Sequence, residues 1–238
     1  MEMDEIAMSN VSLSFETVKG TFKALDQISF SLKRGDNLSL IGESGSGKST
    51  IAKALIGLER IDEGAILYDS EDISKLKLKK IRKYRKNIQS VFQDTSGTLN
   101  PGISTFKNLE EGLINLTNLS KKERKEKVLL FCEDLHLKKE ILDVPVHQLS
   151  GGEQRRLSLI RALIVNPDFL ILDEVTAGLD LLTIEKVLNL LFYYQSKHSI
   201  SYIFITHDIN QAKQISDYII EIKKGKIFRE GKLQRRLK

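Results

Sequence analysis

A glycine-rich loop between an apolar segment and a helical one constrains this chain more than any other feature. The loop reads GESGSGKST, residues 42–50; it follows the apolar run NLSLI and opens the helical pattern STIAKALIGL. In this G-x-x-x-x-G-K-[ST] arrangement, the glycines let backbone N–H groups turn inward toward phosphate oxygens. The helix start adds positive potential, and Lys48 reaches the outer phosphates. The sequence therefore predicts a nucleotide-phosphate site after a buried strand, with the Ser49 hydroxyl offered to Mg²⁺.

Two carboxylates follow the apolar segment FLILD, residues 169–173. Asp173 ends this predicted buried strand, where phosphate-loop enzymes place a second contact to Mg²⁺. Glu174 follows directly, and a carboxylate there can orient or deprotonate an attacking water, a contribution of roughly 10²–10⁴ in rate. An apolar strand that ends in Asp-Glu is common by itself, so the segment takes its meaning from the phosphate loop. Together the two segments fit many phosphate-loop ATPases and kinases.

A second glycine segment, the LSGGE segment (residues 149–153), lies between those two and opens another helical pattern. Its Ser150 and the backbone of Gly151 and Gly152 can form an anion cradle at a helix start. The phosphate loop already holds the nucleotide, so the second cradle predicts that two molecules meet around it. An N-capping serine followed by two turn glycines is the alternative explanation.

The remaining patterns predict one domain, residues 1–238, of a size near the upper end for a single domain. Its amino-terminal part is rich in strand patterns, at residues 12–15, 28–32, 37–40, 64–69 and 87–94. Residues from about 96 to 165 carry helical patterns only, which predicts an inserted helical subdomain. Strand patterns at 169–173 and 202–208 flank a helical one at 181–195, as in a parallel sheet covered by helices. Residues 217–231 are predicted to form a hairpin.

In this order, and over nearly the whole chain, these segments resemble the landmarks of ATP-binding cassette (ABC) transporter ATPases. The LSGGE segment resembles the signature of that family. The resemblance implies an α/β fold of the P-loop NTPase type, with a parallel sheet core, an amino-terminal antiparallel β part and the inserted helical subdomain. It implies an ATPase whose cofactors are ATP and Mg²⁺, and whose hydrolysis is coupled to transport across a membrane.

Four further residues match landmarks of the family. Phe15 corresponds to the aromatic residue that stacks on adenine, and Gln93 to the glutamine that contacts Mg²⁺ or water and reports to the membrane subunit. Asp180 corresponds to the dimer-interface aspartate and His207 to the histidine that senses the γ-phosphate. Taken alone, Phe15 is equally well a core aromatic and His207 a hydrogen-bonded histidine at a strand end.

The resemblance thus assigns each site residue a role. Nucleotide contacts are expected from Phe15, Gly42, Glu43, Ser44, Gly45, Ser46, Gly47, Lys48, Ser49 and Thr50, and across a dimer from Ser150, Gly151, Gly152, Glu153 and Asp180. Mg²⁺ contacts are expected from Ser49, Gln93 and Asp173, and catalytic roles from Glu174, His207 and Gln93.

Partners also follow from the resemblance. A second ABC ATPase subunit, identical or different, would pair head to tail, so that each LSGGE segment closes over the γ-phosphate held by the other chain's Lys48. The residues FQD at 92–94 and LNP at 99–101 are similar to those of cassettes that power import of peptides, nickel or metal-chelator complexes. That similarity implies transmembrane permeases and an extracellular substrate-binding protein. Val175 and the pair Ala177-Gly178 depart from the family pattern, which favours a more flexible interface loop.

Charge leaves a second hypothesis open. The chain has a net charge of +5, and the run KLKLKKIRKYRK, residues 75–86, contains eight basic residues and no acidic one. Such a run is usually a solvated face, with phosphate or lipid binding as the alternative. A soluble cassette protein that acts on nucleic acid, the ribosome or iron-sulfur assembly is the competing function. It is disfavoured because the chain has one cassette and no sustained heptads, so a nucleic-acid partner is not expected.

Location is predicted from two observations. No apolar run approaches the ~18 residues that span a bilayer, and the start MEMDEIAMSN lacks the basic flank and apolar core of a secretory signal. We therefore expect a peripheral protein at the cytoplasmic face of the cell membrane, held there by permease subunits. The single cysteine, Cys132, is most simply a small buried apolar residue.

Overall fold

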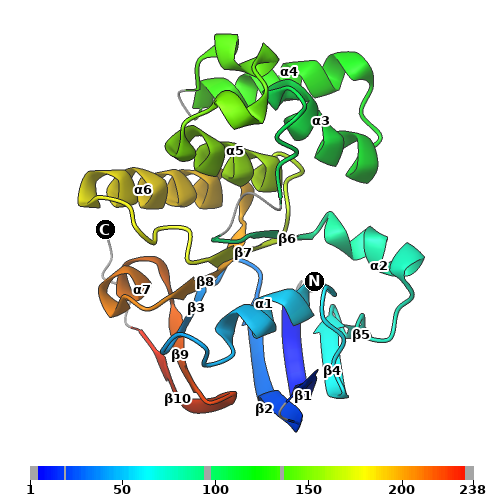
Figure 1. Ribbon diagram of the computed structural model, residues 1–238, viewed down its shortest axis with the longest axis vertical. Helices are drawn as coiled ribbons and strands as arrows, with labels where there is room; N and C mark the ends of the chain where they lie inside the picture. The colour runs from blue at the N-terminus through cyan, green and yellow to red at the C-terminus, as the bar shows by residue number, and fades with distance from the viewer. Residues whose placement is uncertain (1–4, 19, 94–97, 135–136, 234–238) are drawn as a thin grey trace.

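The computed structural model describes residues 5–18, 20–93, 98–134 and 137–233, which form two sheets and a group of helices (Figure 1). The antiparallel sheet contains, in spatial order, β2 (Gly20–Lys33), β1 (Glu5–Thr17), β4 (Glu63–Tyr68) and β5 (Glu71–Asp72). The second sheet contains β10 (Lys226–Lys232), β9 (Tyr218–Lys223), β3 (Leu38–Ile41), β8 (Ser201–Thr206), β7 (Phe169–Asp173) and β6 (Ile88–Val91). Its strands are parallel apart from β10. The expected fold class is confirmed.

Helices cover the parallel sheet and form the upper part of the molecule (Figure 1). They are α1 (Lys48–Leu55), α2 (Leu78–Arg85), α3 (Thr105–Leu116), α4 (Lys121–Asp134), α5 (Gly151–Leu163), α6 (Leu181–His198) and α7 (Ile209–Ile215), with short 3-10 turns η1 (Lys139–Asp143) and η2 (Val146–Gln148). Helices α3, α4 and α5 stand together above β6 and β7, where the sequence predicts the inserted subdomain. The division into a core and an inserted subdomain stays a prediction.

The parallel sheet is buried on both faces, which explains its continuous apolar strands. Along β7, Phe169 and Ile171 join a lower core with α1 and the antiparallel sheet, whereas Leu170 and Leu172 join an upper core with the helices. All five residues of β7 are buried. Because side chains alternate along a strand, this one apolar segment contributes to both cores. Its packing on both faces also fixes the position of the residues that follow it.

Several elements differ from the sequence expectations. Strands β1 and β2 form a hairpin of 13 and 14 residues, much longer than the expected short strands. The basic run contains helix α2, because Ile81 and Tyr84 are buried against the core. Helix α7 had no clear sequence signal. Strand β6 ends at Val91, earlier than expected, and Asp94 lies outside the described residues.

The expectation for the single cysteine is met. Cys132 is fully buried in the upper core, and burial raises the pKa of its thiol to about 11, so it behaves as a small apolar residue. No helix in the described part of the chain combines the length and the apolar character needed to cross a membrane.

Candidate active site

The parallel strands bring the predicted site residues to one edge of the sheet. Val91 is in register with Leu172, so Gln93 follows β6 at about the level where Glu174 follows β7. Asp173 is in register with Ile205 of β8, two residues before His207. Parallel strands end at a common edge, and ligands bind in the crevice outside their carboxyl ends. The sheet thus gathers three separate sequence segments beside the phosphate loop, which follows β3.

The phosphate loop needs glycine for reasons visible in the backbone. Gly42 has φ +150°, and a Cβ added there would lie 2.2 Å from the carbonyl oxygen of Ile222. Gly47 has φ +110°, and its Cβ would lie 2.8 Å from the carbonyl oxygen of Ala24. Both positions therefore exclude a larger side chain by conformation and by space. The loop is held tightly between the β9–β10 hairpin and β2.

Lys48 lies inside the curl of this loop. The side chain is only 5% exposed, and its Nζ donates to the backbone oxygens of Gly42 at 2.9 Å and Glu43 at 2.7 Å. Burial lowers the pKa of Lys48, while the carboxylates of Glu174 and Asp173 act to raise it. The ammonium is therefore held by backbone oxygens. The carboxylates that act on it are those of Asp173, which ends β7, and Glu174, which follows it.

Asp173 carries a buried oxygen with no partner. The residue is 5% exposed, and its Oδ1 has no hydrogen-bond donor among the described residues. Burial raises the pKa of Asp173, opposed by a hydrogen bond with Ser49. Such an orphaned carboxylate oxygen is costly unless a cation or donor meets it. Together with the Ser49 hydroxyl and the amide oxygen of the exposed Gln93, it makes an oxygen donor set of the kind that suits Mg²⁺.

Glu174 and His207 face each other across β7 and β8. The Oε1 of Glu174 lies 3.9 Å from the Nδ1 of His207, with the glutamate side chain 24% exposed and the histidine 69% exposed. Glu174 has φ +49°, and its N–H donates to the carbonyl oxygen of Ile205 at 3.0 Å. A positive φ at a non-glycine residue is uncommon and turns the side chain out of the strand direction. Both groups are open to a ligand at the sheet edge.

The LSGGE segment is a capped helix start. Ser150 is the N-cap of α5 and accepts from the N–H of Glu153 at 3.3 Å, while the Glu153 carboxylate accepts from the Ser150 N–H at 2.9 Å and hydroxyl at 2.6 Å. These bonds lower the pKa of Glu153. Gly151 and Gly152 have ordinary φ, and a Cβ at either would meet no atom within 4 Å. Nothing in the packing of the described residues therefore requires glycine at these two positions.

Asp180 and Phe15 have partners within the chain. Asp180 is the N-cap of α6, accepts from the N–H of Thr183 at 3.0 Å and from its hydroxyl at 2.6 Å, and has a pKa lowered by these bonds. Phe15 is half-buried against the lower core and is paired across the hairpin with the exposed Phe22. The structure thus gives both residues a structural role in addition to any role at a nucleotide.

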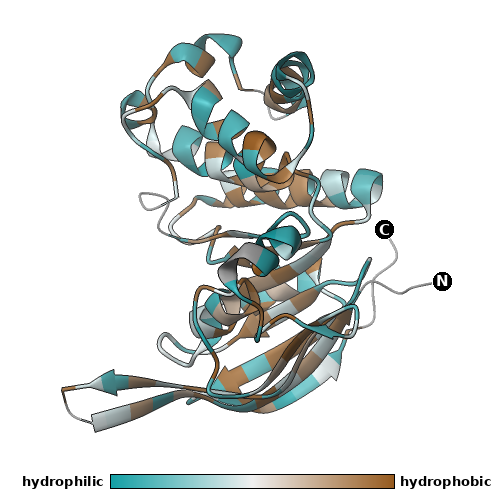
Figure 2. Ribbon diagram, turned by 90° about the vertical axis from the view of Figure 1, so that its right-hand side faces the viewer, coloured by the Kyte–Doolittle hydropathy of each residue, from teal (hydrophilic) through white to brown (hydrophobic). Residues whose placement is uncertain are grey.

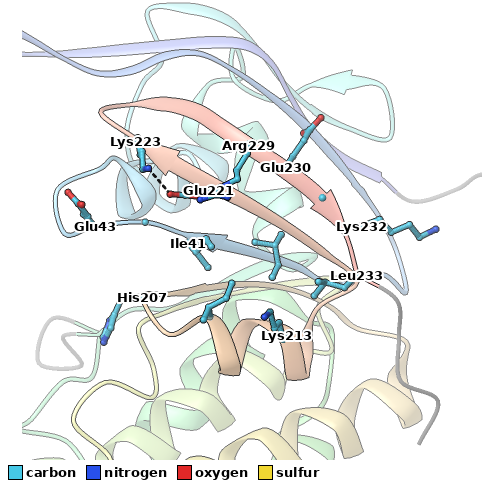
Figure 3. Close-up of a pocket in the computed structure, with 14 residues that line it drawn as sticks. Ile41, Glu43, His207, Lys213, Glu221, Lys223, Arg229, Glu230, Lys232 and Leu233 are labelled. Carbon is cyan, nitrogen blue, oxygen red and sulfur yellow. Dashed lines mark hydrogen bonds and ion pairs between the residues drawn. The ribbon is translucent and has the colours of Figure 1, made fainter.

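Two cavities adjoin the site. The larger, about 670 Å³, begins at Gly42, Glu43 and His207 and continues away from the loop between β9, β10 and α7 (Figure 3). The smaller, about 200 Å³, is lined by Glu174, His207 and the segment that leads to α6. The phosphate loop therefore borders the larger cavity only at one end, and Glu174 opens into the smaller.

One support of the phosphate loop comes from the β9–β10 turn and was not predicted from the sequence. The Gly225 N–H donates to the Ser46 carbonyl oxygen at 2.9 Å, and the Asp26 N–H donates to the Gly225 carbonyl oxygen at 2.8 Å. Asp26 also pairs with Lys226 at 2.9 Å. The glycine in the turn of the predicted hairpin was the only local signal, and nothing in it pointed to a residue about 180 positions earlier.

A family model described as ABC transporter matches residues 25–177 of this chain. The oligopeptide transport ATP-binding protein OppF of Streptococcus pyogenes serotype M1 is 39% identical over 225 residues, which is 93% of this chain and 73% of that protein. The dipeptide transport ATP-binding protein DppF of Escherichia coli K12 is 38% identical over 209 residues, 88% of this chain and 63% of its own length.

Solved structures give the same comparison in three dimensions. The dimeric post-hydrolysis state of the ATP-binding cassette MJ0796, bound to ADP and Pi, superposes with a TM-score of 0.89 at 31% identity. The match covers 97% of this chain and 99% of that one. A second dimeric structure of MJ0796, described as a bacterial ABC transporter cassette, superposes with a TM-score of 0.87 at 30% identity.

Proposed function

The chain belongs to the ABC transporter ATPase family, and on that premise we propose that it is the ATP-hydrolysing subunit that powers a peptide importer. The proposal for the cargo is supported by relatives that are named oligopeptide and dipeptide transport ATP-binding proteins and match about nine tenths of this chain. The observation that carries the ATPase activity is the gathering of Lys48, Asp173 and Glu174 at one sheet edge. Nickel and metal-chelator complexes remain alternative cargoes from the sequence resemblance.

ATP binding uses groups that are already oriented. The backbone N–H groups of residues 42–50 surround the phosphates, and phosphate oxygens replace the two carbonyl oxygens that now hold the Lys48 ammonium. Thr50 continues the first turn of α1 behind the loop. Phe15 offers its ring to the adenine from a position near the turn of the β1–β2 hairpin.

We assign the Mg²⁺ contacts to Asp173, Ser49 and Gln93. The support is the unpartnered Oδ1 of Asp173 and the all-oxygen character of these side chains. The bound ion supplies neutralisation of the charge on the phosphates. Gln93 stands where β6 leads into the helical subdomain, so it can also report nucleotide state to a membrane partner.

Glu174 is the proposed base. Its carboxylate accepts a proton from the attacking water as the water oxygen bonds to the γ-phosphorus and the bond from that phosphorus to the bridging oxygen of the leaving ADP breaks. The positive φ of Glu174 directs the side chain toward the open edge. His207, 3.9 Å from Glu174 and mostly exposed, contacts the γ-phosphate. Lys48 balances the charge that develops on the transferred phosphoryl group.

A second cassette, identical or different, completes each site. Gly151 and Gly152 leave open space beside the N-terminus of α5, so a phosphate held by another chain can approach Ser150 and the backbone. Glu153 holds Ser150 in place, and Asp180 lies at the start of α6 on the proposed interface. Dimeric structures of the cassette MJ0796 support a dimer.

Permease subunits and an extracellular substrate-binding protein complete the proposed importer, which places this chain at the cytoplasmic face of the cell membrane. A permease is expected to dock near Gln93 and α3. A cysteine at the exposed Lys107 of α3 should therefore cross-link to a co-expressed permease, whereas one at the exposed Lys224 in the β9–β10 turn should not. Cross-linking confined to Lys224 would contradict this docking surface.

Lys48→Ala is expected to weaken ATP binding by about 10–100-fold, because charge-assisted hydrogen bonds contribute about 1.5–3 kcal/mol. Turnover should fall with affinity, since the ammonium contacts phosphates before and during the reaction. Nucleotide titration and phosphate release measure the two effects. Lys122→Ala, at an exposed position of α4, is the matched control and should change neither. Unaltered ATP affinity in Lys48→Ala would exclude the assigned role.

The function itself is tested by reconstitution with the permeases and the substrate-binding protein of the proposed peptide importer. ATP turnover in proteoliposomes should rise when the binding protein carries a peptide. Stimulation by a nickel complex and not by peptides would show that the cargo is not a peptide. The ATPase assignment would be unaffected.

A further inference from the structure

A strongly basic surface on α2 has no role in the proposed ATP site. We call it the α2 basic surface, and its exposed members are Lys75, Lys77, Lys80, Arg82, Lys83 and Lys86. Helix α2 lies on the flank at the right of Figure 1, and Figure 2 turns that flank toward the viewer. Residues 75–86 hold eight of the chain's basic residues and no acidic one, while the net charge of the whole chain is only +5. The rest of the chain is therefore net negative.

Buried side chains of α2 attach the α2 basic surface to the rest of the chain. Ile81 and Tyr84, one helical turn apart, are each 6% exposed, and the Ile81 side chain packs against the backbone of Gly57 just after α1. The Tyr84 hydroxyl also donates to the carboxylate of Glu71. The apolar side chains of Ile81 and Tyr84 are thus buried within the chain, and the basic side chains of Lys80, Arg82 and Lys83 face outward.

The local sequence does not support the start of this helix. Its N-cap is Lys77, which makes no side-chain cap hydrogen bond, and its first turn contains no acidic residue. Positive charge in the last turn, from Arg82, Lys83 and Arg85, suits the helix dipole, but like charges four residues apart, such as Arg82 and Lys86, repel each other. A segment that breaks local rules and is held by tertiary contacts points to a use for its charge.

Few carboxylates neutralise the α2 basic surface. Within the described residues, Lys75 is its one member in an ion pair, 2.9 Å from Asp72. Arg82 donates to neutral groups of α3, the carbonyl oxygen of Asn115 at 3.2 Å and its Oδ1 at 3.0 Å. Those bonds orient the guanidinium and leave its charge uncompensated. Beside Asn115, the apolar Ile114 is 54% exposed.

We propose that the α2 basic surface docks on an anionic lipid membrane. Its exposed lysines and arginine match the negative surface potential of anionic headgroups, and Ile114 adds an apolar contact at its margin. Nucleic acid fits less well because Tyr84, the aromatic residue of this segment, is buried and offers no face for base stacking. The choice of a membrane as the partner rests on the proposed transporter role. The expectation that this surface binds an anionic partner rests only on its own charge and exposure.

Co-sedimentation with lipid vesicles tests the proposal. Purified full chain, without nucleotide or permease, is mixed with phosphatidylcholine vesicles that contain or lack phosphatidylglycerol. Binding is expected only to the anionic vesicles, with loss at high salt. The variant Lys80→Glu/Lys83→Glu should bind about tenfold more weakly or worse, since each basic residue near such a surface contributes strongly. Its ATP turnover without vesicles should equal that of the wild type.

Lys186→Glu/Lys213→Glu, an equal charge change at exposed positions of α6 and α7, is the control and should retain most of the binding. Equal losses in the two variants, or undiminished binding by Lys80→Glu/Lys83→Glu, would overturn the proposal. Displacement from the vesicles by mixed-sequence single-stranded RNA at the same phosphate concentration would reassign the surface to nucleic acid. Turnover is measured in the absence of lipid, so failure of the ATPase role and failure of docking are separate results.

Discussion

Glu174→Gln is expected to slow ATP turnover by about 10²–10⁴-fold while ATP binding stays near the wild-type level. Glutamine matches the shape of glutamate and can still hold a water by hydrogen bonding, but it cannot accept the proton. The side chain stands at the open edge of β7, 3.9 Å from His207, and is not part of the loop that grips the phosphates. Single-turnover phosphate release, measured beside nucleotide titration, separates the chemical step from binding.

Asp173→Asn provides the comparison. Asp173 is buried and carries the unpartnered oxygen, so its replacement should weaken Mg-ATP binding and turnover together. The two adjacent residues are then distinguished, because Glu174→Gln lowers the turnover rate alone, whereas Asp173→Asn also weakens Mg-ATP binding. With the partner cassette present, Glu174→Gln should elute as a dimer with ATP and as separate chains with ADP. A Glu174→Gln protein that hydrolyses ATP at the wild-type rate would show that another residue activates the water.

The sequence predicted the parts of the site that depend on short segments. The order of strand, glycine loop and helix around Lys48 appears in consecutive residues, and so does the buried strand that ends at Asp173. Their meeting could also be predicted, because parallel strands share an edge at their carboxyl ends. The capping box of Ser150 and Glu153 is likewise readable from the S-x-x-E spacing.

Other features depend on contacts between distant segments and gave no local pattern. Gly225 supports the phosphate loop through Ser46, and Asn37 joins β3 to the end of α7 by accepting and donating hydrogen bonds with Asp217 and Ile215. Helix α2 begins without a capping side chain and is held in place because Ile81 and Tyr84 are buried against other parts of the chain. In each case tertiary packing decides the structure, and a single sequence does not state which distant residues will meet.

Ser150→Arg is expected to reduce ATP turnover by about 10²–10³-fold or more, since it removes the hydroxyl that we propose binds the phosphate of the other chain's nucleotide and fills the open space beside Gly151. Arginine also removes the N-cap of α5, so a second effect on stability must be separated. Ser104→Arg is the matched control, because Ser104 is the N-cap of α3 and accepts from the N–H of Lys107 at 3.4 Å. It should lose a similar cap and keep its turnover.

We propose that the LSGGE segment binds a nucleotide held by another chain. The ATP affinity of the isolated Ser150→Arg chain, titrated alongside its turnover and thermal stability, tests this proposal. We predict wild-type affinity at the phosphate loop together with lost hydrolysis. If ATP affinity in the isolated, folded Ser150→Arg chain falls as steeply as turnover, Ser150 belongs to the same site as Lys48 and the two-chain account is wrong.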